Sequence, residues 1–180
     1  KKKLVKNYKL KNLNKSDGFD ISKKKNLKKY LNVKIDCILN LSGQINQNYN
    51  SMKKTIIKGN ENIINFCKKK KTLVYFFSTS LVYGYSSVKK KETSQKKPIC
   101  KYSNLKHIAE KKYIKSNINY KILRLCHIYD DKKNGVIKNL TGNKLKEKYF
   151  YSDNIETYRN YLFVEDLVNL ICKIIKKGLK

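Results

Sequence analysis

The sequence contains only two arginines, Arg124 and Arg159, although 43 of its 180 residues are basic and its formal net charge is +30. Arginine supplies the bidentate contacts by which proteins read base edges and hold phosphates, so its scarcity argues against specific nucleic-acid recognition. Lysine attracts phosphates without sequence preference. The lysine excess stands beside many asparagines, isoleucines and tyrosines, which indicates an AT-rich coding bias. We therefore expect no specific nucleic-acid partner.

Long apolar runs and structural cysteine patterns are also missing. No run approaches the ~20 apolar residues that cross a bilayer, and no charged-then-apolar signal segment opens the chain, so we expect no membrane association. The five cysteines lie at least 26 positions apart, which gives neither a disulfide framework nor zinc-ligand spacing. They are Cys37, Cys67, Cys100, Cys126 and Cys172. A reducing cytosol fits them best, and we predict a cytoplasmic protein without a metal site.

Three short apolar runs, rich in β-branched and aromatic residues, predict buried strands. They cover residues 35–41, 72–77 and 120–128. Because they lack polar alternation, they are typical of a parallel sheet that is covered on both faces. Helix-length segments alternate with them at residues 22–31, where Ser22 can cap the helix, at 56–66 and at 102–114. This alternation predicts a doubly wound α/β sheet, with an antiparallel α+β arrangement as the alternative.

The pattern changes after Ile128. A polar stretch that contains glycine occupies residues 130–148, and residues 159–178 predict a short strand that enters an amphipathic helix. One face of that helix carries Val164, Leu167, Val168, Ile171, Ile174 and Ile175. Another polar stretch, at residues 89–101, contains the single proline and predicts a surface loop.

Tyr102 and Lys106 form a Tyr-x-x-x-Lys pair, which a helix places on one face about a turn apart. The spacing alone carries little, because the chain holds five such pairs, beginning at Tyr30, Tyr49, Tyr85, Tyr102 and Tyr129. The context selects Tyr102. A buried strand that ends in FSTSLVYG at residues 77–84 precedes it, the loop with Pro98 comes next, and a strand with Arg124 follows.

This order resembles the extended short-chain dehydrogenase/reductase family of NAD-dependent epimerases and dehydratases. In that family a Ser-Ser/Thr-Ser-x-Val-Tyr-Gly strand end precedes Tyr-x-x-x-Lys, and a Leu-Arg-x-x-Asn-x-Tyr-Gly strand follows. Further segments resemble the family's other motifs: GFDI at residues 18–21, ILNLSG at 38–43 and RNYLFVED at 159–166, while Gly59-Asn60 stands where the family has Gly-Thr. The resemblance covers residues 20–168 and implies a Rossmann-like fold with a doubly wound parallel sheet.

The resemblance also implies roles for individual residues. The catalytic residues would be Tyr102, Lys106 and Thr79. The cofactor, NAD or NADP, would contact Asp20, Ile21, Leu41, Ser42, Gly43, Ser78, Tyr102, Lys106 and Leu125. The nucleotide-sugar substrate would contact Thr79, Ser80, His127 and Arg159.

Simpler alternatives remain for several of these residues. Tyr102 can be a core aromatic beside a solvated Lys106, Thr79 can bond the next turn of the chain, and Arg159 can be a surface charge. His127 is expected to line the pocket and not to bind a metal, because no other residue has suitable spacing.

The chain departs from the family's pattern at several positions. Thr55 and His127 stand where the family has asparagines, and Asp130 stands where it has glycine, which affects cofactor and substrate contacts. Ser80 and Leu81 replace the Asp-Glu pair that supplies the proton carriers of sugar-nucleotide 4,6-dehydratases, so a dehydratase is disfavoured.

The glycine-rich turn that binds pyrophosphate at a helix amino terminus is absent from the sequence. Gly18 is the only glycine before Asp20, and the chain begins with Lys1 instead of methionine. We therefore expect a fragment whose first strand, glycine turn and helix lie upstream of Lys1.

The resemblance implies that Tyr102, as a phenolate, removes a proton from a sugar hydroxyl while hydride leaves the same carbon for the nicotinamide. A free tyrosine titrates near ~10, so this base needs a shift of about three units, or ~4 kcal/mol. An ammonium about 4 Å away supplies ~4 kcal/mol at an effective dielectric of ~20, whereas an exposed helical pair supplies only ~0.3 to 0.5. Lys106 therefore suffices only if it is partly buried.

We expect residues 1–130 to form an incomplete NAD(P)-binding Rossmann-like domain with the catalytic residues. Residues 131–180 would begin a small substrate-binding region, with a helix that returns to the core. The expected function is that of a sugar-nucleotide epimerase. A nucleotide-sugar 4-ketoreductase is the alternative within the enzyme class, and a non-catalytic relic that binds polyanions is the alternative outside it. A homodimer through the Tyr102 helix, with Ile108 and Ile114 at its interface, is compatible with the resemblance.

Overall fold

A computed structural model describes residues 8–43, 48–86, 88–130 and 160–178. The chain divides into two compact units. One spans Lys11–Leu125, and the other combines Lys1–Leu10 with Cys126–Lys180. The boundary at residue 130 between a cofactor-binding domain and a substrate-binding region stays a prediction.

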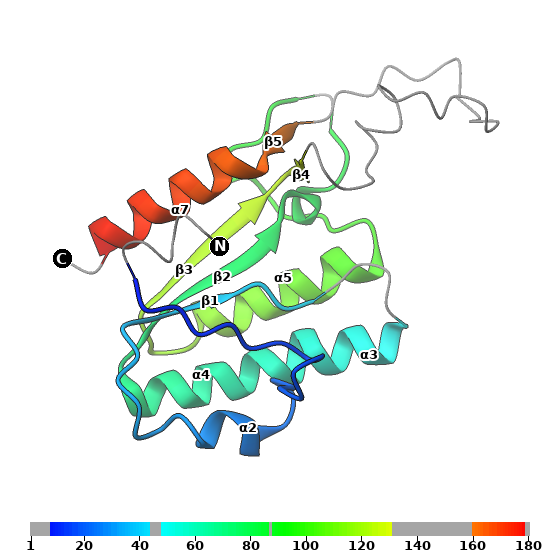
Figure 1. Cartoon of the computed structure of the whole chain (residues 1–180). Helices are drawn as coiled ribbons and strands as arrows, with labels where there is room; N and C mark the ends of the chain where they lie inside the picture. Colours follow the sequence, from blue (N-terminus) through cyan, green and yellow to red (C-terminus); the bar gives the residue numbers. More distant parts are fainter. Residues whose placement is uncertain (1–7, 44–47, 87, 131–159, 179–180) are drawn as a thin grey trace, which may run out of the picture. The chain divides into compact units, whose positions relative to one another are not determined.

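The Lys11–Leu125 unit is built on a sheet of parallel strands in the order β1-β2-β3 (Figure 1). Strand β1 spans Cys37–Asn40, β2 spans Leu73–Thr79 and β3 spans Tyr120–Leu125. Both pairings are parallel, with Ile38 opposite Val74 and Phe76 opposite Ile122. The predicted apolar runs therefore form a parallel sheet as expected, and the antiparallel alternative is wrong.

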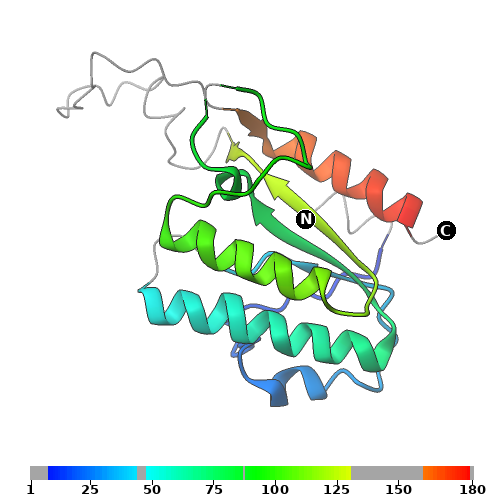
Figure 2. The same cartoon turned by 180° about the vertical axis from the view of Figure 1, so that it is seen from behind.

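Helices connect the strands of this unit. The β1–β2 connection contains α3 (Tyr49–Lys53), the π-helix η1 (Lys54–Lys58) and α4 (Gly59–Lys70), and the β2–β3 connection contains α5 (Lys101–Ile114). Helices α4 and α5 lie side by side against one face of the sheet (Figures 1 and 2). The helix at residues 102–114 is confirmed, and the one at 56–66 is confirmed with an unexpected π-turn at its start.

The core of this unit lies between the sheet and the two long helices. Val74 and Phe76, two positions apart on β2, face the helices because side chains alternate along a strand. Both are fully buried, and the Phe76 ring stacks on Tyr113 of α5 with 4.9 Å between centroids. Ile56 and Ile63 complete the contact from the other connection, so the β2 strand is the centre of the packing.

The predicted helix at residues 22–31 is much shorter in the structure. Helix α2 spans only Lys24–Lys28 and follows Lys23, which makes no side-chain cap bond. The prediction that Ser22 caps a helix is wrong, because its hydroxyl instead donates to Oδ1 of Asp20 at 2.7 Å. Asp20 competes for the hydroxyl because short polar side chains readily bond their close neighbours in the chain.

The second unit contains a smaller parallel pair of strands, β4 (His127–Tyr129) and β5 (Tyr161–Phe163). The predicted strand at residues 120–128 is therefore two strands, β3 and β4, that belong to different units. Strand β5 leads into α7 (Val164–Gly178), as predicted. Its buried residues are Leu167, Ile171 and Ile175. Within the described ranges, no helix is long and apolar enough to cross a bilayer.

Strand β2 leads into a short 3-10 helix, η2 (Ser80–Tyr83), which ends at Gly84. Gly84 has a φ of +74°, and a Cβ at this position would lie 2.3 Å from the carbonyl oxygen of Lys97. Glycine is therefore required twice, once for the backbone conformation and once for the close approach of the loop that leads to α5.

We predict that Gly84→Ala lowers the free energy of unfolding by about 2–4 kcal/mol, since left-handed strain adds to an overpacked backbone contact. Gly18→Ala is the matched control, because Gly18 also has a positive φ, +76°, but a Cβ there would meet no atom within 4 Å. Urea denaturation of both variants measures the difference. Equal losses in the two variants would show that the Lys97 approach contributes nothing.

Candidate active site

Helix α5 carries both Tyr102 and Lys106, and its start is set by a capping box. The Cys100 sulfur accepts from the backbone N–H of Ser103 at 3.4 Å, while the Ser103 hydroxyl oxygen accepts from the Cys100 N–H at 3.1 Å. Two otherwise unpaired donors at the helix end are satisfied in this way. The helix therefore begins at Lys101, which puts Tyr102 in its first turn and Lys106 one turn later.

The Lys106 side chain is buried, with 1% of its surface exposed. Its Nζ donates to the carbonyl oxygens of Phe77 at 2.8 Å and Ser42 at 2.9 Å. Phe77 lies near the carboxyl end of β2, and Ser42 follows the carboxyl end of β1. Ligands of open α/β sheets bind beyond these strand ends, so Lys106 marks the edge of the sheet where a site is expected.

Burial shifts the ionisation of both side chains. It lowers the pKa of Lys106 to about 8, although the negative charge of Glu110 opposes the shift. Burial also raises the pKa of the Tyr102 phenol, with a smaller contribution from Cys100. The Lys106 Nζ lies 5.7 Å from the centre of the Tyr102 ring. Lys106 is thus buried as the activation of Tyr102 requires, but the chain's own residues keep the phenol protonated at neutral pH.

Thr79 is the last residue of β2 and caps η2. Its Oγ1 accepts from the N–H of Leu81 at 3.2 Å, which is the bond to the next turn that the simpler interpretation predicts. The side chain is 8% exposed, and Thr79 lies opposite Leu125 in the sheet. Ser80 follows as the half-buried first residue of η2. Thr79 and Leu125 both end their strands, at the same edge of the sheet as the carbonyls that bind Lys106.

A buried ion pair joins α5 to the sheet. The Arg124 guanidinium donates to the Glu110 carboxylate through Nη2 at 2.8 Å and Nε at 3.0 Å, and Ser78 donates to the same carboxylate at 2.5 Å. Glu110 is 1% exposed and lies one turn after Lys106. Ser78, predicted to contact the cofactor, thus donates its hydroxyl hydrogen bond to Glu110.

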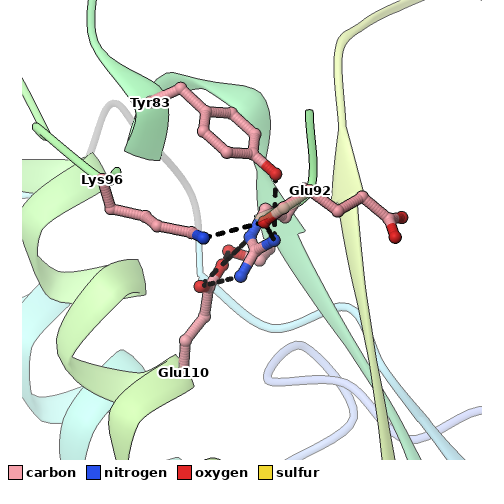
Figure 3. Close-up of polar contacts among 6 residues, drawn as sticks. Tyr83, Glu92, Lys96 and Glu110 are labelled. Atoms are coloured by element: carbon pink, nitrogen blue, oxygen red, sulfur yellow. Dashed lines mark hydrogen bonds and ion pairs between the residues drawn. The ribbon is translucent and has the colours of Figure 1, made fainter. Parts of the chain in front are cut away.

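The same arginine also holds the loop that leads to Tyr102. Its Nη1 donates to the Tyr83 hydroxyl at 2.9 Å and to the Glu92 carbonyl at 3.3 Å, and Lys96 donates to that carbonyl at 2.8 Å. Figure 3 shows the side chains of Tyr83, Lys96 and Glu110 directed toward these contacts, whereas Glu92 takes part through its carbonyl and its side chain points away. No sequence motif singled out Glu110, although its spacing of four residues from Lys106 places it on the same helix face.

The turn after β1 packs tightly against the neighbouring elements. Gly43 has a φ of +104°, and a Cβ there would lie 2.8 Å from Cγ1 of Ile56 and 3.4 Å from Cε of Lys106. Ser42 is held by Asn40, whose Oδ1 accepts from both the Ser42 N–H and its hydroxyl. Leu41, in contrast, points away from the core with 66% of its surface exposed.

Asp20 and Ile21 lie in a turn that α4 supports. Asp20 Oδ1 accepts two bonds from Ser22. Burial raises the pKa of Asp20, but these bonds and the nearby lysine charges outweigh that effect, so the net pKa lies below its usual value. Asn62 donates to the carbonyls of Ile21 and Ser22, and Gly59 leaves the space that the Ile21 side chain fills.

Two predicted substrate contacts are not among the described residues of the Lys11–Leu125 unit. His127 is the exposed first residue of β4, in the second unit, with its ring 5.6 Å from that of Tyr161. Arg159 lies outside the described residues. The assignment of both to a substrate site stays a prediction.

We predict that Glu110→Gln lowers the free energy of unfolding by about 2–3 kcal/mol, because it leaves the largely buried Arg124 charge without its partner. Glu61→Gln is the control: Glu61 pairs with Lys58 and Lys112 at the surface, and its loss should cost less than about 1 kcal/mol. Chemical denaturation of both variants checks this. A Glu110→Gln protein as stable as the Glu61→Gln protein would contradict it.

The lowered pKa of Lys106 predicts a pH effect on stability. Between its folded pKa of about 8 and the ordinary 10.5 of lysine, the unfolded chain binds more protons than the folded chain. Stability therefore rises with pH across this window, and the gain between pH ~7 and ~9.5 is about 2 kcal/mol. Lys106→Met removes this gain.

The unfolding free energy of the wild type minus that of Lys106→Met should thus increase by this amount. The raised pKa values of Cys67 and Tyr113 lower stability at high pH in both proteins, so they cancel in the difference. Lys111→Met, at an exposed position of the same helix, is the control variant. For each variant, its unfolding free energy is subtracted from that of the wild type. If this difference changes with pH equally for Lys106→Met and Lys111→Met, the burial of the Lys106 ammonium does not cause the pH dependence of stability.

Solved structures share this arrangement of strands and helices. The Bordetella bronchiseptica enzyme WbmG, in complex with NAD and UDP, has a TM-score of 0.72 at 20% identity, over 86% of this chain and 51% of that chain. A dTDP-4-dehydrorhamnose reductase from Clostridium acetobutylicum has a TM-score of 0.81 at 22% identity, over 98% of this chain and 65% of that chain.

The UDP-glucose 4-epimerase of Thermotoga maritima, with UDP-glucose, has a TM-score of 0.74 at 19% identity, over 93% of this chain and 66% of that chain. These likenesses confirm the Rossmann-like fold. The chain spans about half the length of WbmG.

No curated protein matches the sequence. The NAD dependent epimerase/dehydratase family, in contrast, matches residues 2–180. Together with the Tyr102–Lys106 helix at the carboxyl ends of parallel strands, this match confirms the resemblance that the motifs predicted. The chain belongs to the NAD dependent epimerase/dehydratase family.

Proposed function

We propose that the chain carries the catalytic residues of an NAD(P)-dependent sugar-nucleotide epimerase, which oxidises and re-reduces one sugar carbon through a keto intermediate. The observation that carries the proposal is the position of Lys106. Its ammonium bonds to the carbonyls at the ends of β1 and β2 while Tyr102 lies one turn earlier on the same helix. No other Tyr-x-x-x-Lys pair in the described residues has its lysine buried in this way.

The described residues fit a nicotinamide cofactor at this edge of the sheet. Lys106 has three donors and uses two on backbone carbonyls, which leaves a buried ammonium proton for a ribose hydroxyl. Asp20 is ionised at neutral pH, since its pKa is lowered, and its carboxylate can accept further bonds. Ser42 and Gly43 bring backbone to the same edge. When bound, NAD supplies the hydride acceptor and a positive charge.

Tyr102 moves the proton in this proposal. Its phenol is protonated in the chain alone because burial raises its pKa, so it becomes a base only when positive charge gathers near its oxygen. Lys106 contributes part of that charge from its buried position. Thr79 and Ser80, at the end of β2, would orient the sugar hydroxyl whose proton Tyr102 removes, while His127 and Arg159 remain proposed substrate contacts.

The substrate class is proposed from the relatives. WbmG is described with NAD and UDP, and the Thermotoga protein with UDP-glucose, so a nucleotide sugar is the substrate we propose here. One observation favours the alternative of a nucleotide-sugar 4-ketoreductase. The Clostridium reductase has a higher TM-score than WbmG and the Thermotoga epimerase, and its match covers 98% of this chain. An epimerase retains its reduced cofactor through the cycle, whereas a ketoreductase releases it oxidised.

Compartment and assembly are also proposals. The five cysteines are free in the structure, which fits a cytoplasmic protein in a reducing environment. Ile108 and Ile114 are 37% and 58% exposed on α5, so they are accessible for the homodimer contact that we propose for this helix.

Turnover of the full-length protein tests the function. We predict that Tyr102→Phe lowers kcat by at least about 100-fold, the typical contribution of a general acid–base, while binding of NAD persists. Tyr85→Phe is the matched control, since Tyr85 and Lys89 have the same spacing but Tyr85 is 87% exposed. Chromatography of the nucleotide sugars after incubation with UDP-sugars and dTDP-sugars measures kcat, and nicotinamide absorbance follows the redox state of the cofactor.

The outcomes separate the alternatives. Turnover without net release of oxidised or reduced cofactor supports the epimerase, and stoichiometric consumption of reduced cofactor supports the ketoreductase. If the full-length protein binds neither NAD nor NADP, the enzyme proposal is wrong. In that case, binding of anionic polymers that falls steeply with salt would identify the relic instead.

A further inference from the structure

Asn60 occupies the centre of a buried polar network that no motif predicted. Its side chain is 0% exposed and makes bonds to three different elements. The Nδ2 group donates to the Ile56 carbonyl of η1 at 2.5 Å. The Oδ1 atom accepts from Asn40 Nδ2 at the end of β1 and from the Tyr113 hydroxyl of α5, both at 2.7 Å.

The network continues from Asn40 to Lys106. Asn40 Oδ1 accepts from the Ser42 hydroxyl at 2.6 Å and from the Ser42 N–H at 3.1 Å. The carbonyl of Ser42 then accepts from Lys106 Nζ at 2.9 Å. A continuous series of contacts thus leads from the π-turn through two buried amides to the ammonium of the proposed active site.

The direction of these bonds is determined at both ends by backbone groups. The Ser42 N–H can only donate, so Asn40 must turn its oxygen toward it and its amide nitrogen toward Asn60. The Ile56 carbonyl can only accept, so Asn60 must turn its nitrogen toward η1 and its oxygen toward Asn40. Each position therefore requires a group that donates at one end and accepts at the other, which an amide does and a carboxylate does not.

We call the series of hydrogen bonds from the Ile56 carbonyl through Asn60, Asn40 and Ser42 to Lys106 the relay. The packing around the relay links its geometry to the position of Lys106. A Cβ added at Gly43, next to Ser42, would lie 2.8 Å from the Ile56 side chain and 3.4 Å from Lys106 Cε. The π-turn, the Ser42–Gly43 turn and the Lys106 stem therefore lie in direct contact. A shift of the Ser42 turn changes the surroundings of the ammonium, because close-packed interiors transmit small displacements.

We propose that Asn60 is a positioning residue for Lys106: through Asn40 it holds the Ser42 carbonyl at the lysine Nζ. This inference rests on the proposed function for its relevance to catalysis. The bonds themselves connect Asn60 to Lys106 in the chain alone.

Asn60→Asp tests the relay without changing the size of the side chain. An ionised carboxylate cannot donate to the Ile56 carbonyl, so the relay breaks, whereas a protonated carboxyl both donates and accepts and restores it. The ionisable neighbours of this position do not interfere, because burial raises the pKa of the Cys67 thiol to about 12 and raises that of the Tyr113 hydroxyl as well. At the far end of the relay, the pKa of Lys106 is lowered to about 8, mainly by burial.

The readout is the acetylation of Lys106 by acetic anhydride in the full-length protein, measured by mass spectrometry relative to the exposed Lys111 of the same helix. In Asn60→Asp we expect Lys106 to react about tenfold faster than in the wild type at pH values above the pKa of the new carboxyl, which burial raises; this is the effect of losing one hydrogen bond to a charged group. Below that pKa the excess reactivity should disappear as the new carboxyl becomes protonated.

Asn62→Asp is the control. Asn62 is also buried on α4 and donates its amide to two backbone carbonyls, but those belong to Ile21 and Ser22. This variant puts a carboxylate in a comparable place and should lose comparable stability without a selective change at Lys106. Equal changes at Lys106 in both variants, or no change in Asn60→Asp, would overturn the proposal.

The two proposals can fail separately. If Lys106 reactivity is unchanged in Asn60→Asp while Tyr102→Phe abolishes turnover, the relay is wrong and the enzyme proposal stands. If the relay is confirmed and the protein binds no nicotinamide cofactor, the positioning of Lys106 is correct and its catalytic meaning is not.

Discussion

The rest of the site depends on one constraint, the burial of a lysine ammonium between two strand ends. An isolated charge in a protein interior is strongly unfavourable, so its surroundings must supply bonds and opposite charge. Here the carbonyls of Ser42 and Phe77 supply the bonds, and Glu110, one helical turn away, supplies part of the charge. Each of these groups comes from a different element, so β1, β2 and α5 must meet correctly before Lys106 can be buried at all.

One face of α5 is consequently organised by charge. Tyr102, Lys106 and Glu110 follow one another at four-residue intervals, and Arg124 closes the series from β3. The arginine also bonds the loop that precedes the helix, through Tyr83 and the Glu92 carbonyl. Because a buried pair is far more sensitive to the loss of one partner than a surface pair, the loop, the helix and the sheet are held together by a contact that tolerates little change.

Much of the fold could be predicted from the sequence, since buried parallel strands have a distinctive composition: the run at 35–41 contains β1, and the run at 72–77 covers the first five residues of β2. The order of strand end, loop and Tyr-x-x-x-Lys indicated the family, which a single motif could not. Other features depend on three-dimensional neighbours. Ser22 had the composition of a helix cap but bonds Asp20 instead. Asn40 and Asn60 look like ordinary polar residues twenty positions apart, and only the packing of β1 against α4 brings their amides together.

The π-turn at Lys54–Lys58 makes the connection between β1 and β2 sensitive to its length. Its backbone bond, from the Gly59 N–H to the Lys54 carbonyl, encloses one residue more than an α-helical turn. Changing this turn to regular α-helical winding without deleting a residue would rotate α3 by about 100° relative to α4. Met52, which is 5% exposed, would then leave the core, and the Ile56 carbonyl would lose its place beside Asn60. Relatives that have an uninterrupted helix in this connection should therefore be one residue shorter there, and an alignment that closes this gap would pair the wrong residues.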